Sequence, residues 1–369
     1  MIWLALPAVA AAAYYTLAIV AAARWRRSSP PSHAPSPPVS ILKPVHGRDP
    51  RFWDAIRSHA EQRYPEFEIL FGVASPDDPA LEDIRRLERE YPNLPIRTYI
   101  VSTRARNAKV GVLAELARQA RYPMLVVNDS DIRVPPGYLA AVTAPLADPE
   151  VGLVTCLYRA AADSWPARAE ALGIATEFAP SVLVARLLGV AEFALGSTMA
   201  FRSATLAEIG GFEAISDYLA DDYQLGCRIH ERGYRIRFAP VVVETNLGGG
   251  GWAEVWRHQL RWSRTIRVSR PSGYFGYAIT HATFWAAVAL AGGEWPCALL
   301  ALALRMWAGI WTGAGILRDP KTARDFWLIP LRDLGGFAVW LAGLFGDIVD
   351  WRGQKLRLLS NGKIRSESP

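Results

Sequence analysis

The chain has 369 residues, of which 51% are hydrophobic and 21% charged, so it is neither disordered nor fibrous and can form one large or two modest domains. Lys and Arg number 41 against 35 Asp and Glu, and a formal net charge of +6 fits phosphorylated substrates, anionic lipid or nucleic acid. Three scattered cysteines, Cys156, Cys227 and Cys297, exclude a disulfide framework and a Cys-based zinc site. Because the basic residues cluster beside apolar segments and in one arginine-rich stretch, we expect no nucleic-acid binding.

The first segment in chain order is an uncharged apolar run, Ile2–Ala23, that is long enough to cross a bilayer. A signal peptide would carry positive charge before its apolar run, whereas here Arg24, Arg26 and Arg27 follow it. We therefore predict an uncleaved transmembrane helix over residues 1–23, with a cleaved leader as the alternative. The positive-inside rule then places the chain after this helix in the cytoplasm.

A Pro- and Ser-rich linker over residues 24–38 precedes a region in which strand-like and helix-like runs alternate, which predicts a βαβ-type parallel sheet. The expected strands are Val39–Leu42, Phe67–Val73, Ile96–Val101 and Met124–Val127. The expected helices are Pro50–Arg63, Ala80–Glu90 and Val110–Ala120. Since ligands bind outside the carboxyl ends of the strands in such sheets, one crevice should collect Lys43, Asp77–Asp78 and Asp129–Asp131. The first strand is expected to stop at Lys43 because Pro44 follows it.

An Asp-x-Asp sequence follows the last of these strands directly, as Asn128-Asp129-Ser130-Asp131. Side chains two residues apart on an extended chain project to the same side, so Asp129 and Asp131 should face together. Paired carboxylate oxygens suit Mg²⁺ or Mn²⁺, which also bind substrate phosphates. A turn with two solvated Asp residues at a strand end would produce the same pattern.

Three further features carry possible chemistry. Asp222, in Ala220-Asp221-Asp222-Tyr223, opens a predicted helix and is either a cap or a general base facing the crevice. Asn107-Ala108-Lys109 also opens a helix, where it either meets a phosphate or is an ordinary cap with a surface lysine. The stretch Trp256–Arg267 forms a basic amphipathic helix with Arg257, Arg261 and Arg264 on one face. This helix could lie on the anionic inner leaflet, clamp a pyrophosphate beside an indole, or do both.

Apolar segments return in the last quarter of the chain, at about Tyr277–Leu290, Trp295–Leu317 and Phe326–Val349. Arg332 and Asp333 interrupt the third segment, and charge at membrane depth is costly, so we expect that segment to lie in the interface. We therefore predict a catalytic domain over residues 39–270, membrane-embedded helices over 271–350 and a basic cytoplasmic tail over 351–369.

Taken in order, these motifs resemble the GT-A catalytic domain of membrane glycosyltransferases, specifically the ceramide glucosyltransferase-like family. The matching pieces are Val39-Ser40-Ile41-Leu42-Lys43-Pro44, Asp77-Asp78-Pro79-Ala80, Asn107-Ala108-Lys109, Asn128-Asp129-Ser130-Asp131, Gly196-Ser197-Thr198-Met199, Gly210-Gly211-Phe212, Ala220-Asp221-Asp222-Tyr223 and His258-Gln259-Leu260-Arg261-Trp262. The resemblance implies an α/β fold, a GT-A nucleotide-sugar glycosyltransferase domain with an N-terminal anchor and C-terminal membrane helices. It also implies a multi-pass protein of the cell inner membrane with a cytoplasmic catalytic domain.

The resemblance further assigns roles to residues of this chain. Asp222 matches the base that deprotonates the acceptor, and Arg261 and Trp262 match the Arg-Trp pair of a (Gln/Arg)-x-x-Arg-Trp motif. Asp129 and Asp131 match the metal ligands, with Mg²⁺ or Mn²⁺ as cofactor. The residues implied to bind the nucleotide sugar are Lys43, Asp78, Asn107, Lys109 and Asp129. The residues implied on the acceptor side are Gly196, His258 and Trp262.

The sequence departs from the family at His258, where Gln or Arg is usual, so a fixed positive charge is absent there. The layout is similar to that of hopanoid-biosynthesis glycosyltransferases. The implied reaction is inverting transfer of N-acetylglucosamine or glucose from a UDP-sugar to a hydroxyl of a hopanoid polyol or ceramide. The rival hypotheses are a processive polysaccharide synthase of the cellulose or chitin synthase type, and a non-catalytic lipid- or nucleotide-binding membrane protein.

Overall fold

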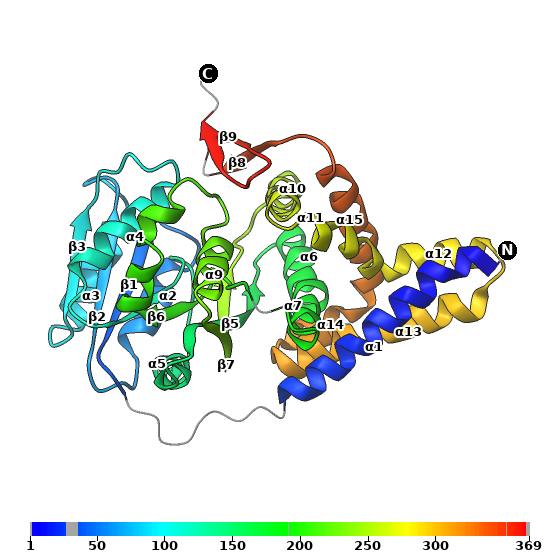
Figure 1. Ribbon diagram of the computed structural model, residues 1–369, viewed down its shortest axis with the longest axis horizontal. Coiled ribbons are helices and arrows are strands. Elements are labelled where there is room, and N and C mark those ends of the chain that lie inside the picture. Colours follow the sequence, from blue (N-terminus) through cyan, green and yellow to red (C-terminus); the bar gives the residue numbers. More distant parts are fainter. Residues whose placement is uncertain (1, 27–35, 191, 352, 367–369) are drawn as a thin grey trace. The chain divides into compact units, whose positions relative to one another are not determined.

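The computed structural model describes residues 2–26, 36–190, 192–351 and 353–366, and the chain separates into two compact units (Figure 1). We call Ser29–Tyr158 with Ala191–Gly248 the sheet unit. Met1–Ser28, Arg159–Val190 and Gly249–Pro369 form the helical unit. This division differs from the boundaries expected from the sequence, because residues 159–190 and 249–270 group with the helical unit.

The sheet unit is built on a mixed seven-stranded sheet with the order β3-β2-β1-β4-β6-β5-β7. Its strands are β1 (Val39–Val45), β2 (Phe67–Val73), β3 (Ile96–Ile100), β4 (Met124–Val127), β5 (Val151–Ala161), β6 (Met199–Arg202) and β7 (Arg235–Asn246). The first four strands are parallel, which confirms the predicted βαβ pattern. The all-parallel expectation is wrong beyond β4, because β6 runs antiparallel to both β4 and β5.

Helices cover both faces of this sheet, as the period-two alternation of a strand requires. Val39 and Ile41 of β1 contribute to one hydrophobic cluster, whereas Leu42 contributes to the other. The first cluster includes α2 (Phe52–Ala60), α3 (Ala80–Glu90) and α5 (Tyr138–Thr143). The second includes α4 (Ala108–Gln119), α8 (Ser203–Glu208), the 3-10 turn η4 (Phe212–Ile215) and α9 (Asp221–Glu231).

Strand β1 extends past the point at which the sequence was expected to end it. Pro44 lies within the strand and pairs in register with Gly72 of β2. The pairing of β1 with β4 ends at Leu42, so the β4 side of the strand needs no ladder donor at Pro44. A proline without an N–H is tolerated where a strand has such a free edge, and Lys43 is thereby held in the strand.

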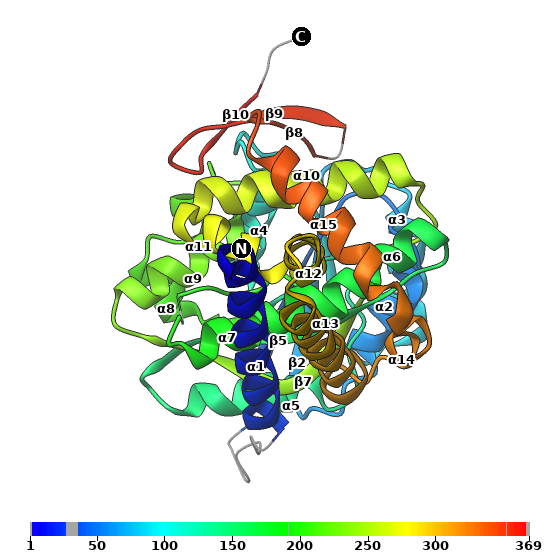
Figure 2. The same cartoon turned by 90° about the vertical axis from the view of Figure 1, so that its right-hand side faces the viewer.

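The helical unit gathers three sequence segments around a core of apolar helices. Its elements are η1 (Ile2–Ala5), α1 (Leu6–Arg26), α6 (Trp165–Gly173), η3 (Ile174–Phe178), α7 (Ala179–Leu187), α10 (Trp252–Ser269), α11 (Pro271–Gly276), η5 (Tyr277–Thr280), α12 (Ala282–Ala291), α13 (Trp295–Ile310), η6 (Trp311–Ile316), α14 (Pro320–Asp325), η7 (Phe326–Leu328) and α15 (Ile329–Gly343). Helices α1, α12 and α13 lie side by side (Figure 1 and Figure 2). Small residues line the buried face of α1 and allow close approach of the helices, namely Ala8, Ala11, Ala12, Ala18, Ala21 and Ala22.

Two helices of the described chain are long and apolar enough to cross a membrane, Trp3–Arg26 and Trp295–Ile316. The predicted segment Tyr277–Leu290 falls on the 3-10 turn η5 and the ten-residue helix α12, and α12 is shorter than a bilayer requires. The predicted segment Phe326–Val349 contains the fifteen-residue helix α15 and then turns into strand β8 (Ile348–Trp351). The predicted tail includes β9 (Gln354–Leu358) and β10 (Ile364–Ser366), which complete a three-stranded antiparallel sheet with β8.

A fully buried ion pair joins α13 to α15. The Arg305 Nη2 atom lies 2.6 Å from Asp333 Oδ1, and both side chains are almost completely excluded from solvent. Arg305 also donates to the Thr176 carbonyl oxygen of η3, at 2.8 Å. Gly309 makes room for the guanidinium, since an added Cβ there would lie 2.9 Å from Nη1. These polar contacts connect α13, α15 and η3 within an otherwise apolar unit.

Substitution of one member of this pair should destabilise the helical unit strongly, because it leaves the other charge buried and unpaired. Arg305→Leu should lower the free energy of unfolding by about 3–5 kcal/mol, and the Arg305→Leu/Asp333→Leu double variant should recover most of that loss. Arg324→Leu is the matched control, because it removes an exposed guanidinium while Asp325 keeps its pair with Arg168, and it should cost under about 1 kcal/mol. Denaturant unfolding of detergent-solubilised protein measures the three variants against the wild type. Equal effects of the Arg305 and Arg324 variants would contradict this account.

Candidate active site

The Asp-x-Asp segment is fixed by buried polar groups behind it. Asn128, at the end of β4, is fully buried, and its Nδ2 donates to the Ser197 carbonyl oxygen at 2.7 Å and to the Tyr138 hydroxyl at 2.9 Å. These bonds satisfy an amide that would otherwise be costly to bury. The chain that follows, with Asp129 and Asp131, is therefore held in one position.

Lys43 supports the same segment from β1. Its side chain is fully buried, and Nζ donates to the Asp129 carbonyl oxygen at 2.7 Å. Burial lowers the pKa of Lys43 to about 8, against the opposing effect of Asp131, Asp129 and Asp49. The amine therefore stays mostly protonated at neutral pH, and in this position it meets the main chain of the site rather than solvent.

Lys109 bridges two carboxylates, one that follows β4 and one at the start of α9. Its Nζ lies 2.8 Å from Asp129 Oδ1 and 2.9 Å from Asp221 Oδ2. Burial by itself would lower the pKa of Lys109, but the charges of Asp129 and Asp221 outweigh burial and raise it. The sequence singled out Lys109 and Asp129, but it gave no reason to select Asp221 as the second partner.

Asn107 places Lys109. The Asn107 side chain caps α4 by accepting from the Val110 N–H at 3.2 Å, and its Nδ2 donates to the Tyr218 carbonyl oxygen at 2.8 Å. Both polar groups of this fully buried side chain are thus bonded to the main chain. The cap hypothesis accounts for Asn107, and the residue links α4 to the loop that leads to Asp221.

Asp222 is held by two backbone N–H groups at the start of α9. Its Oδ2 accepts from Gly196 at 2.8 Å and its Oδ1 from Tyr223 at 2.7 Å. Burial and the adjacent charge of Asp221 raise the pKa of Asp222 to about 6, although Lys109 and both N–H groups act in the opposite direction. Asp222 is therefore a more basic carboxylate than an ordinary aspartate.

Gly196 lies where two of these carboxylates converge. A Cβ added to Gly196 would lie 3.3 Å from Asp222 Oδ2 and 3.4 Å from Asp129 Oδ2. The two oxygens thus face one point, on which any larger side chain would intrude. The structure therefore brings together Asp129, Asp222, Lys109 and Gly196, four of the residues selected from the sequence.

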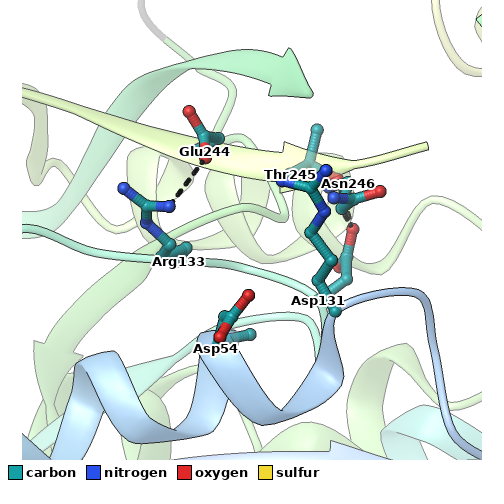
Figure 3. Close-up of a pocket in the computed structure, with 8 residues that line it drawn as sticks. Asp54, Asp131, Arg133, Glu244, Thr245 and Asn246 are labelled. Atoms are coloured by element: carbon teal, nitrogen blue, oxygen red, sulfur yellow. Dashed lines mark hydrogen bonds and ion pairs between the residues drawn. The ribbon is translucent and has the colours of Figure 1, made fainter. Parts of the chain in front are cut away.

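Asp131 turns toward the end of β7. Its Oδ2 accepts from the Thr245 hydroxyl and from the Asn246 N–H at 3.4 Å, and these contacts are drawn in Figure 3. Burial and the charge of Asp129 raise the pKa of the Asp131 carboxyl. Asp131 also lines a small pocket whose other lining residues are Arg51, Asp54, Ala55, Arg133, Glu244, Thr245 and Asn246. Sequence reasoning did not select Thr245 or Asn246, because they lie more than a hundred residues away.

The partners of the Asp78 carboxylate are backbone N–H groups rather than charged side chains. Its Oδ2 accepts from the Gly47 N–H at 2.8 Å, and its Oδ1 accepts from the Ala80 N–H at 2.9 Å. It therefore fixes the loop after β1 and starts α3. Gly47 has φ +71°, a left-handed conformation that favours glycine in this loop.

The remaining selected residues, His258, Arg261 and Trp262, lie on α10 in the helical unit. The rings of His258 and Trp262 pack with their centroids 4.7 Å apart. On the same helix, Arg264 and Arg267 donate to main-chain carbonyls that follow α15. Arg264 is thus engaged within its own unit.

The carboxylates of the Asp-x-Asp segment are of the ligand type that hard divalent cations prefer. Within the described residues, no group of three or more His, Cys, Asp or Glu side chains could hold a metal ion. The carboxylates of Asp129 and Asp131 provide hard oxygen donors, and each keeps an oxygen outside the pairs just described. Magnesium-type sites commonly combine one or two carboxylates with water and substrate phosphate.

The sheet and the site define a mixed α/β fold of the GT-A glycosyltransferase type. A mannosyltransferase from Pyrobaculum calidifontis, in complex with GDP-Man and Mn²⁺, shares this fold with a TM-score of 0.55 and 21% identity, over 92% of this chain and 97% of that one. The family model for glycosyl transferase family 21 matches residues 3–364. The chain belongs to glycosyl transferase family 21.

Curated relatives agree with this family. Ceramide glucosyltransferase 1 of Caenorhabditis elegans is 32% identical over 200 residues, which are 53% of this chain and 43% of the relative. Ceramide glucosyltransferase 3 of the same organism is 30% identical over 203 residues, 54% of this chain and 44% of the relative. The chain thus matches less than half the length of these relatives. The resemblance to the ceramide glucosyltransferase-like family is confirmed, and the hopanoid branch stays a prediction.

Removal of the Lys109 charge should destabilise the sheet unit, because Asp129 and Asp221 would lose their common cation. Lys109→Met should lower the free energy of unfolding at pH 7 by about 2–4 kcal/mol. The loss should shrink as the pH falls below about 6, where protonation of Asp222 removes part of the negative charge around Lys109. Thermal unfolding across this pH range measures both effects.

Lys109→Arg is the matched control, because it keeps the positive charge and should stay closer to the wild-type Tm at every pH. Were the Met and Arg variants to unfold alike at pH 7, the double ion pair would not be what stabilises the site.

Proposed function

We propose that the protein transfers N-acetylglucosamine or glucose from a UDP-sugar to a hydroxyl of a membrane lipid, a hopanoid polyol or ceramide. The observation that carries this proposal is the convergence of Asp222 and Asp129 at Gly196, with one of the two carboxylates unusually basic. Membership of glycosyl transferase family 21 and the ceramide glucosyltransferase relatives support the reaction class and a lipid acceptor.

In this proposal Asp222 is the general base. The backbone N–H groups of Gly196 and Tyr223 fix its orientation, and its raised pKa makes it a better proton acceptor while leaving it ionised at neutral pH. Asp222 takes the proton of the acceptor hydroxyl as that oxygen bonds to the anomeric carbon. The bond from this carbon to the UDP oxygen breaks with its electron pair, so UDP leaves and the configuration inverts.

Asp129 and Asp131 are proposed to hold Mg²⁺ or Mn²⁺, with the remaining ligands from diphosphate and water. A divalent ion there supplies positive charge for the leaving diphosphate. The Mn²⁺ in the complex of the Pyrobaculum mannosyltransferase supports this choice. Lys109 pairs with the Asp129 carboxylate and orients it, and Lys43 fixes the main chain of Asp129.

The other roles assigned from the sequence stay proposals. Asp78 would contribute to the nucleotide pocket, and Arg261 and Trp262 would act on the leaving diphosphate and the acceptor. These assignments rest on the family motifs, since the geometry of the sheet unit does not bear on α10.

The lipid acceptor is also supported by the surface of the helical unit. Among the described residues, every strongly exposed large hydrophobic side chain except Ile100 belongs to that unit. They include Trp295, Leu299 and Trp307 on α13, each more than half exposed. Exposed apolar area of this extent is typical of a membrane-embedded surface. We propose a multi-pass protein of the cell inner membrane with the catalytic unit in the cytoplasm.

Release of UDP by purified protein in detergent tests the function. UDP-glucose and UDP-N-acetylglucosamine would each be offered with ceramide and with a hopanoid polyol, in Mn²⁺ or chelator. Metal-dependent release with one pair is expected. No release with any pair, from protein that is folded and binds a UDP-sugar, would contradict the proposal.

Asp222→Asn should abolish transfer without loss of stability. The turnover number should fall by about 10²-fold or more, because the amide cannot accept the proton. The wild-type rate should fall below about pH 6 as Asp222 is protonated. Because the folded-state pKa is raised, the wild type gains stability as the pH falls through about 6, and the variant should lack this gain. UDP release and Tm against pH measure both. A variant with wild-type turnover would exclude Asp222 as the base.

Asp131→Asn should weaken metal binding. Removal of one of two charged ligands should raise the apparent Kd for Mn²⁺ by about tenfold or more, in the presence of UDP. Asp148→Asn, which neutralises an exposed carboxylate of the same unit, is the control. Isothermal titration with Mn²⁺ measures the change. If both variants bound Mn²⁺ like the wild type, the ion would have to lie elsewhere.

A further inference from the structure

A buried carboxylate of the helical unit pairs with His258. Glu170, on α6, has a side chain only 3% exposed, and its Oε1 lies 2.5 Å from His258 Nδ1. The same oxygen accepts from Gln259 Nε2 at 3.0 Å. Two consecutive residues of α10 thus meet one carboxylate, although 88 and 89 residues separate them from it in the sequence.

This contact determines which ring nitrogen of His258 carries the proton. An ionised carboxylate can only accept, so Nδ1 must carry the hydrogen. In a neutral imidazole Nε2 is then left with a lone pair and can only accept a hydrogen bond. Glutamine or arginine at this position would offer N–H donors instead.

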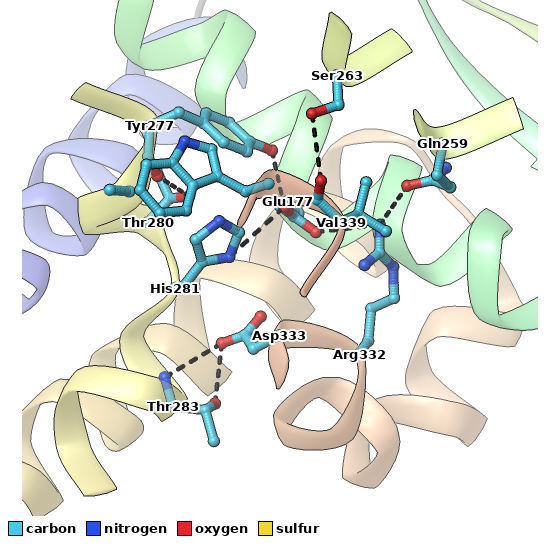
Figure 4. A network of polar contacts seen from close by, with 12 residues as sticks. Glu177, Gln259, Ser263, Tyr277, Thr280, His281, Thr283, Arg332, Asp333 and Val339 are labelled. Carbon is cyan, nitrogen blue, oxygen red and sulfur yellow. Dashed lines mark hydrogen bonds and ion pairs between the residues drawn. The ribbon is translucent and has the colours of Figure 1, made fainter. Parts of the chain in front are cut away.

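Gln259, which bonds to Glu170, is itself held by Arg332. Arg332 Nη2 donates to Gln259 Oε1 at 2.8 Å and lies 3.3 Å from Glu177 Oε2 (Figure 4). Two glycines without side chains, Gly173 and Gly336, leave room for the Arg332 guanidinium. A Cβ added to Gly173 would lie 2.3 Å from Arg332 Nε, and one added to Gly336 would lie 2.9 Å from Nη1.

The ring of His258 is the accessible end of this otherwise buried arrangement. Its side chain is 28% exposed and packs on Trp262. Both rings lie on a helix of the unit that carries the two long apolar helices. A lipid head group that reaches this pair would meet an aromatic surface with one oriented hydrogen-bond acceptor.

We propose that Glu170 is a positioning residue that fixes His258 with its proton on Nδ1, so that Nε2 accepts a hydrogen bond from a hydroxyl of the acceptor head group. The inference rests on the proposed function and deepens it. The hydroxyl recognised is not the one that is glycosylated, so the site selects lipid head groups with at least two hydroxyls. A head group with one hydroxyl lacks the donor that Nε2 requires.

The test compares acceptors that differ in their number of hydroxyls, in the wild type, in Glu170→Gln and in a control variant. Short-chain ceramide, which has two hydroxyls, and the same ceramide lacking the secondary hydroxyl are offered with the UDP-sugar, and a hopanoid tetrol and its monohydroxyl analogue are run in parallel. The wild type should prefer the acceptor with more hydroxyls by about 3- to 10-fold in kcat/KM, the value of one neutral hydrogen bond. In Glu170→Gln the amide can donate to Nδ1, so the hydrogen of the imidazole is no longer confined to Nδ1. This variant should lose most of the preference.

Glu254→Gln is the control, because it makes the same chemical change at an exposed position of α10. Its preference should equal that of the wild type. A purely structural role for Glu170 would lower the rates with both acceptors by the same factor and would overturn the inference. Nitrogen-15 NMR of labelled histidine gives an independent readout, since the wild type should show a protonated Nδ1 at His258. A protonated Nε2 would overturn the inference whatever the kinetics.

Different results would overturn the proposed function and the positioning role of Glu170. No UDP release by the wild type with any acceptor would overturn the proposed function, and this inference with it. Release with an acceptor preference that Glu170→Gln leaves intact would overturn the positioning role alone.

Discussion

The ion pairs of Lys109 with Asp129 and Asp221 are the interaction on which the candidate site depends. Without a shared cation, Asp129, Asp221 and Asp222 would place several negative charges at neighbouring strand and helix ends, where burial already opposes ionisation. Lys109 offsets part of this negative charge, while burial and the charge of Asp221 still raise the pKa of Asp222 to about 6. A residue with a perturbed pKa beside a charge-compensated pair is the arrangement that general-base chemistry needs. The basicity of Asp222 therefore arises from its buried position together with the charge of its neighbour Asp221.

The two units have complementary compositions. The sheet unit contributes the point at Gly196 that the carboxylates of Asp129 and Asp222 face. The helical unit contributes two apolar helices and a core stabilised by a buried Arg305–Asp333 pair. A lipid glycosyltransferase requires both, because its donor is a water-soluble nucleotide sugar and its acceptor stays in the bilayer. Membership of glycosyl transferase family 21 over nearly the whole chain agrees with one protein that combines them.

Much of the fold was predictable from local pattern. The strands Phe67–Val73 and Met124–Val127 and the helix Ala80–Glu90 have the predicted bounds, because each is short, periodic and bounded by turn residues. Two features were not predictable. The antiparallel strand β6 has no local signal that distinguishes it from a parallel one. Pro44 is tolerated because β4 stops pairing at Leu42, and that tertiary fact is absent from the sequence.

The sequence selected the charged residues of the candidate site but not their supports. Asp129, Asp222 and Lys109 were selected because they lie at the ends of predicted elements and follow a known motif order. Asp221, which pairs with Lys109, and Glu170, which pairs with His258, could not be selected, since one looks like a helix-start acid and the other lies far along the chain from His258. Lys43 and Asn107 were selected as ligand contacts, and the structure shows both engaged with the main chain.

The account claims that one carboxylate, Asp222, activates the acceptor in a single displacement. The configuration of the newly formed glycosidic bond tests this most directly. Purified protein in nanodiscs would be given an α-linked UDP-sugar and the lipid acceptor, and the anomeric proton of the glycolipid would be assigned by NMR. The account predicts a β-linked product. An α-linked product would require retention of configuration, and would contradict direct displacement with Asp222 as the base.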